Sequence, residues 1–95
     1  MLYTLIHSPY ACDFEALLRI ARLGDDLLMV SDGVIAALVG SSAVCLLTAS
    51  PLMLYALESD VVARGLIKRC ASNIKIINYN DFVCLTEKQP QQIMW

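Results

Sequence analysis

Residues Gly24–Val34 read GDDLLMVSDGV, and the rest of the chain is organised around this stretch. Its apolar run, Leu27–Val30, predicts a strand buried on both faces, as strands of parallel sheets usually are. The Ser31-Asp32-Gly33 that follows is a tight polar exit that can turn directly into a helix. Sites in open α/β sheets are usually built at the carboxyl ends of the strands. We therefore expect Ser31, Asp32 and Gly33 to form either a functional site or a subunit contact.

On both sides of this stretch, strand-like and helix-like segments alternate. Further strands are predicted at Leu2–Ile6, Leu52–Leu57 and Ile74–Ile77, where β-forming and other apolar residues cluster. Short helical patterns separate these strands, and Gln89–Trp95 reads as a tail with apolar residues at its tip. Such alternation predicts an α/β fold, a single small domain over residues 1–95 with a mostly parallel sheet flanked by helices.

Polar residues and glycines mark the expected helix boundaries. The first helix is expected to begin after Asp13, to face the sheet with Phe14, Leu17, Leu18 and Ala21, and to end at Gly24. The later helices are expected, in chain order, at Val34–Val39, from a Ser42 cap through Ala49, at Val61–Arg64 with Ser59 or Asp60 as the cap, and from an Asn80 cap to about Lys88.

The composition limits what the chain can be. Ninety-five residues are enough for one modest core, but the hydrophobic fraction is 58%, above the usual figure of about 45–50%. This surplus predicts an obligate protein partner, because obligate interfaces resemble a core cut in half. The net charge of −2 leaves no electrostatic footprint for direct binding of nucleic acid.

No secretion signal is recognised, so we expect a protein of the cytoplasm, where cysteines stay reduced. Residues 33–57 carry no charge, yet Gly40-Ser41-Ser42 and Ser50-Pro51 divide them into pieces too short to cross a bilayer. We therefore expect a soluble chain without a membrane span.

The four cysteines are the first candidates for chemistry. No C-x-x-C pair and no histidine cluster is present, so we expect no metal and no cofactor. Cys45 and Cys84 lie in apolar helical stretches and are interpreted as small buried core residues. Cys12 precedes a helix N-terminus, where the helix dipole would lower the pKa of its thiol, and Cys70 is in a similar but weaker position. Cys12 is therefore the candidate nucleophile, although an inert thiol is the simpler interpretation.

His7 and the chain end complete the set of candidate contacts. His7 ends the first predicted strand, at the same sheet edge as Asp32, and two interpretations are open: a His7–Asp32 pair, or a loop histidine bonded to a backbone group. Asp32 itself is expected to accept amide hydrogen bonds at the start of the next helix. Met94 and Trp95 are expected to pack against this domain or a partner. No glycine-rich phosphate loop is present, which disfavours nucleotide binding.

Several segments, distributed from end to end, resemble the TusB/DsrH family. They are Met1–Leu5, Ser8-Pro9, Asp13–Arg19, Gly24–Leu28, Asp32–Val34, Tyr55–Leu57, Asp60, Ala63–Leu66, Asp81–Val83 and Met94-Trp95. The resemblance implies a DsrE/DsrF/DsrH-like α/β fold. It also implies a place in a bacterial sulfur relay, in which a persulfide passes from a cysteine desulfurase through TusA, the TusBCD complex and TusE to the enzyme that thiolates the wobble uridine of certain tRNAs.

In such a complex the family member is a subunit beside TusC and TusD in a heterohexamer, a dimer of heterotrimers, and the persulfide is carried by a cysteine of TusD. The DsrH branch has a cysteine of its own in the first helix. An alignment through Gly24 places Leu17 at that position, and Cys12 lies five residues earlier, outside the motif. The resemblance therefore implies a non-catalytic structural subunit.

Two other interpretations are kept beside this one. The first is a persulfide-carrying sulfurtransferase subunit that uses Cys12 or, with less support, Cys84. The second is an independent small-molecule-binding domain of flavodoxin-like shape, which the missing phosphate loop disfavours.

Overall fold

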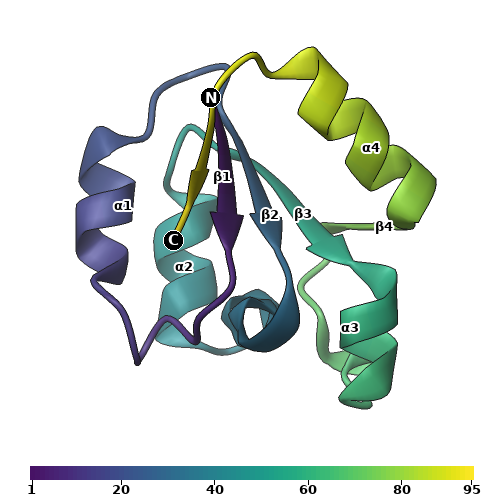
Figure 1. The fold of residues 1–95 in the computed structure, drawn as a ribbon. Coiled ribbons are helices and arrows are strands. Elements are labelled where there is room, and N and C mark those ends of the chain that lie inside the picture. Colours follow the sequence, from purple (N-terminus) through teal and green to yellow (C-terminus); the bar gives the residue numbers. More distant parts are fainter.

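The computed structural model describes residues 1–95 as an α/β fold with one five-stranded, all-parallel sheet (Figure 1). The strand order is β4-β3-β2-β1-β5, so β2, from the Gly24–Val34 stretch, is the central strand. The elements are β1 (Leu2–Leu5), α1 (Phe14–Ile20), β2 (Asp26–Met29), the 3₁₀-helix η1 (Ser31–Ala37), α2 (Ser42–Thr48), β3 (Met53–Leu57), α3 (Glu58–Ala63), the 3₁₀-helix η2 (Ile67–Arg69), β4 (Lys75–Ile77), α4 (Tyr79–Lys88) and β5 (Gln92–Met94).

The predicted fold class and the four predicted strands are confirmed, with strand ends shifted by one residue in places. All four residues of β2 are buried, because β1 and β3 pair with its two edges and helices cover both of its faces. Side chains alternate along the strand, so Leu27 and Met29 point to one face and Leu28 to the other.

The two faces of the sheet are covered unequally. On one face, α1, α2, η1 and Val61 of α3 enclose a core of 17 buried residues. The other face carries a core of only four, in which Leu85 of α4 packs on Leu2, Leu28 and Ile77. Figure 1 shows α1 and α2 on one side of the sheet and α4 on the other. The face under α4 is therefore thinly covered.

Some predicted helix boundaries are wrong by a few residues. Asp13 does cap α1, accepting a hydrogen bond from the Ala16 amide at 3.1 Å, but the helix ends at Ile20. Gly24, at φ 95°, lies instead in the turn before β2. The segment predicted as a helix at Val34–Val39 is the 3₁₀-helix η1, which begins at Ser31 and stops before Leu38, since Leu38 bridges to Cys70.

Three caps are also different from those predicted. Ser41, rather than Ser42, caps α2, and Asn78, rather than Asn80, caps α4. In each case, the residue whose oxygen reaches an amide three positions later is the one with extended backbone. The N-cap of α3 is Leu57, without a side-chain hydrogen bond, which leaves the carboxylate of Asp60 free for another partner.

The expected tail is the largest correction. Gln92–Met94 form β5, a parallel edge strand whose register places Leu2 opposite Gln92 and Thr4 opposite Met94. Ile93 and Trp95 pack against the larger core. The segment is too short and polar to predict a strand, but β1 offers it an unpaired edge.

Candidate functional site

The predicted Ser31-Asp32-Gly33 site lies at the carboxyl end of β2, where α3 holds it in place. Ser31 has a left-handed backbone, with φ 52°, and its amide donates a 2.8 Å hydrogen bond to Oδ2 of Asp60. Oδ1 of Asp32 accepts a 2.9 Å hydrogen bond from Nη2 of Arg64. Asp60 thus supplies the carboxylate at the start of η1 that was expected of Asp32, and Gly33 is buried against the main chain of β1.

His7 bonds with the chain end and not with Asp32. Its Nδ1 lies 2.9 Å from the main-chain oxygen of Trp95, so the backbone interpretation of His7 is the one observed. The Trp95 amide donates to the Thr4 oxygen at 2.7 Å, and its indole Nε1 donates to the Asp13 oxygen at 3.0 Å. Trp95 therefore joins the ends of β1 and β5 to the cap of α1, whereas the neighbouring Met94 side chain is 70% exposed.

An open cavity of about 550 Å³ adjoins this contact and includes Cys12 in its wall. It is lined by Ile6, His7, Ala11, Cys12, Met94 and Trp95. Burial raises the pKa of the Cys12 thiol above its ordinary value, and the nearby Asp13 carboxylate raises it further. The expected lowering by the helix dipole is therefore wrong, because burial and a like charge oppose the thiolate more strongly. At neutral pH Cys12 is a protonated thiol and a poor nucleophile.

The other cysteines also differ from expectation. Cys45 and Cys84 are exposed, not buried as predicted, because each lies on the solvent side of a helix whose opposite residues face the sheet. Cys70 is partly buried, and burial raises the pKa of its thiol too, in spite of its neighbours Lys68 and Arg69.

A polar network at the amino end of the sheet was missed by the sequence analysis. Asp26 is fully buried, and its Oδ2 accepts hydrogen bonds from Lys88 Nζ at 3.1 Å and Gln89 Nε2 at 2.8 Å. Its Oδ1 has no partner. The Met1 amino group donates to Gln89 Oε1 at 2.7 Å and lies 3.2 Å from Oδ1 of Asp25. The Asp25-Asp26 pair before an apolar run is the sole sequence signal of this network.

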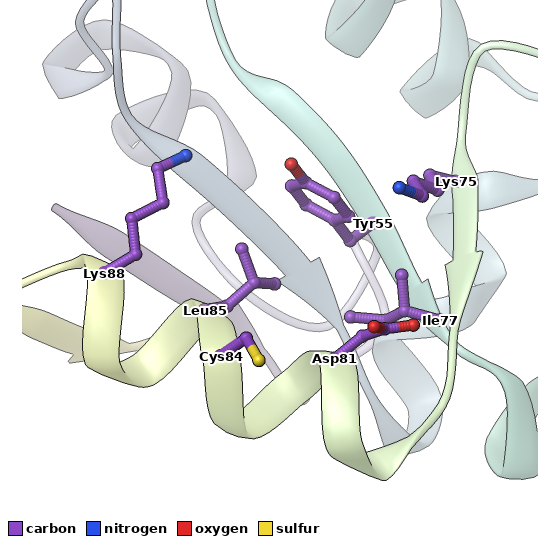
Figure 2. A pocket seen from close by; sticks show the side chains of 7 residues that line it. All are labelled: Tyr55, Lys75, Ile77, Asp81, Cys84, Leu85 and Lys88. Atoms are coloured by element: carbon purple, nitrogen blue, oxygen red, sulfur yellow. The ribbon is translucent and has the colours of Figure 1, made fainter.

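A second cavity, of about 190 Å³, lies between α4 and the strands β3 and β4 (Figure 2). It is lined by Tyr55, Lys75, Ile77, Asp81, Cys84, Leu85 and Lys88. The sequence analysis did not single it out, since the residues come from three separate segments. The signal was the spacing 81, 84, 85, 88, which puts four of them on one face of a helix.

The structure assembles neither a catalytic pair nor a metal centre. No three side chains among the histidine, cysteine, aspartate and glutamate residues are grouped so that they could hold a metal ion. His7, Cys12 and Trp95 share one cavity, but the imidazole is engaged by a backbone oxygen and the thiol is disfavoured as a thiolate. What the carboxyl edge does provide is a rigid, well-bonded surface. None of the helices has the length and apolar character needed to cross a bilayer.

Comparison with known proteins relates the chain to one family over almost its full length. A family model described as "DsrH like protein" matches residues 7–92. Protein TusB of Sodalis glossinidius (strain morsitans) is 68% identical over 95 residues, and Protein TusB of Yersinia pestis (strain Pestoides F) is 50% identical over 95 residues; in both cases all of each chain is covered.

Two solved structures share the fold. The crystal structure of the ychN protein from E. coli superposes with a TM-score of 0.78 at 18% identity, covering 99% of this chain and 97% of that one. The solution structure of protein Tm0979 from Thermotoga maritima superposes with a TM-score of 0.69 at 22% identity, covering 96% and 97%. At these identities the likeness concerns the fold alone.

Proposed function

Because this chain belongs to the DsrH-like family, we propose that it is the non-catalytic structural subunit of a TusBCD-type sulfur relay. The relay supplies persulfide sulfur for 2-thiolation of the wobble uridine of tRNA in the bacterial cytoplasm. The observation that carries the proposal is the full-length identity, 68% and 50%, to two relatives that are both named Protein TusB.

The absence of a suitable carrier thiol supports a structural role. A persulfide carrier needs a thiol that ionises readily and can reach two partner proteins in turn. Leu17, at the position aligned with the cysteine of the DsrH branch, is fully buried in the larger core and cannot carry sulfur. Burial disfavours the thiolates of Cys12 and Cys70.

The surface supports a role in assembly. Several large apolar side chains are well exposed, among them Leu23 at 90%, Met94 at 70% and Tyr10, Tyr79 and Val39 at 67–68%. Exposed apolar side chains in this number are typical of a subunit whose partners cover part of its surface. We propose TusC and TusD as these partners, in a heterohexamer that receives sulfur from TusA and delivers it to TusE. His7, Ser31, Asp32, Gly33, Met94 and Trp95 are proposed as interface residues, since they line one edge of the molecule.

One observation favours the alternative, a persulfide-carrying subunit that uses Cys12. This thiol is only partly buried and lines an open cavity beside His7. A partner that covered Asp13, or supplied a positive charge, would change the balance that now disfavours the thiolate.

Co-expression with TusC and TusD tests the structural role. We expect a stable complex whose mass, measured by native mass spectrometry, corresponds to two copies of each subunit. Expressed alone, the chain is expected to self-associate or precipitate, because its apolar interface stays uncovered. A well-behaved monomer in analytical ultracentrifugation, with no binding to TusC and TusD, would refute the proposal.

A further inference from the structure

The cavity under α4 combines an apolar floor with a cationic rim. Tyr55 and Lys75 are directly opposed in the register of β3 and β4, so both face α4, as does Ile77 two residues further along. From the other side, Asp81, Cys84, Leu85 and Lys88 line the cavity. Figure 2 shows the hydroxyl of Tyr55 at the same end of the view as the amino groups of Lys75 and Lys88.

The two lysines differ in how their charges are compensated. Lys88 forms an ion pair with the buried Asp26, which fixes its ammonium group at the edge of the cavity. Lys75 is exposed and takes part in none of the three ion pairs of the chain, so its ammonium lacks an acidic partner. An uncompensated cation beside a phenolic hydroxyl and an apolar floor attracts a negative group that carries an apolar body.

We propose that this cavity binds a small organic monoanion. Its apolar body rests on the ring of Tyr55 and on the buried side chains of Ile77 and Leu85, and its negative group faces Lys75. The volume of about 190 Å³ suits a molecule with about one ring, such as an aryl carboxylate. The site is independent of the sulfur-relay role, because none of its residues belongs to the proposed interface edge.

Asp81 restricts the charge of the ligand. Its carboxylate also lines the cavity, and Figure 2 shows it beside Ile77, away from the amino group of Lys88. A second negative group would meet this carboxylate, so a dianion fits less well than a monoanion. A cation would have to approach the lysines, whose charges oppose it.

The exposed thiol of Cys84 provides a reporter within the cavity, and Cys45 provides a control on a different helix. The full chain is labelled with iodoacetamide, which is neutral, and the rate at each cysteine is measured by peptide mass spectrometry. Benzoate is the probe, and benzamidine, of similar shape but positive, is its matched control. We expect benzoate to slow labelling of Cys84 about fivefold at roughly four times its Kd, and to leave Cys45 unaffected.

Two variants make the test specific. Lys75→Gln, an exposed side chain without an ion pair, should abolish the protection by benzoate. Lys68→Gln, an equally exposed lysine outside the cavity, should retain it. Equal protection by benzamidine, equal protection of Cys45, persistence of the effect in Lys75→Gln, or no protection of Cys84 by benzoate would each overturn the proposal.

Discussion

A Cβ atom placed on Gly33 would lie 1.9 Å from the carbonyl oxygen of Leu5, closer than any two such atoms can approach. This glycine sits in η1, directly after the central strand, and packs on the end of β1. The requirement is one of space, because Gly33 does not have a positive φ. The Asp32-Gly33 exit from β2 is therefore a packing necessity as well as a turn.

Gly33→Ala should lower the free energy of unfolding by more than about 3 kcal/mol, since the added methyl group must displace main chain in the core. Gly40→Ala is the matched control. Gly40 has a positive φ of 82° but open space around it, so its substitution should cost only about 1 kcal/mol. Denaturant titration measures both, and equal losses would contradict the packing argument.

Asp60→Ala should destabilise the chain by about 1 kcal/mol, the usual cost of losing a capping carboxylate. Its Oδ2 is the hydrogen-bond acceptor for the strained Ser31 amide, at 2.8 Å. Asp32→Ala should cost less, because its pair with Arg64 is exposed to solvent and screened. Thermal unfolding of the two variants should rank them in that order, and the reverse order would refute it.

Stability should fall as the pH rises above the ordinary thiol pKa. In the unfolded chain, Cys12 and Cys70 titrate near 9.0, whereas burial raises the pKa of both in the folded chain. Below pH 9 both states hold the proton; above it, the unfolded state loses protons first and is favoured. Cys70→Ala should reduce the slope of stability against pH from about 9 upward, and Cys45→Ser, an exposed thiol, should leave it unchanged. An unaltered slope in Cys70→Ala would count against this assignment.

Deleting Ile93–Trp95 should weaken assembly with TusC and TusD. The deletion removes most of β5, frees the edge of β1 and breaks the Trp95 contacts to Thr4 and Asp13. Gel filtration of the co-expressed subunits measures the effect. Trp95→Phe, which loses the indole bond but keeps the strand, should have a smaller one. An unchanged complex after the deletion would contradict the prediction.

Cys12→Ser should leave tRNA thiolation essentially intact, because a thiol whose pKa is raised by burial and by Asp13 is unsuited to carry sulfur. Loss of the whole chain should abolish thiolation by collapsing the complex. Wobble-uridine thiolation is measured in a deletion strain that expresses either the Cys12→Ser chain or the unaltered one. Thiolation lost while the heterohexamer still assembles would make this subunit a carrier.

The amino-acid sequence by itself determined the parallel α/β sheet and its central strand. The apolar run Leu27–Val30 has no polar residue to face solvent, and this pattern is stable only between two covered faces. The sequence also located the cap Asp13 and the polar exit at Ser31–Gly33, because these depend on neighbours a few residues away. Its TusB/DsrH resemblance agrees with the family match over residues 7–92.

Only the tertiary structure decided the features that depend on segments far apart in the chain. Residues 92–94 become β5 because β1 has a free edge, and Asp26 is buried because Lys88 and Gln89 reach it from the end of α4. The exposure of Cys84 follows from the way in which α4 turns Leu85 to the sheet. Local periodicity cannot fix such outcomes, because they are set by which surfaces meet after the chain has folded.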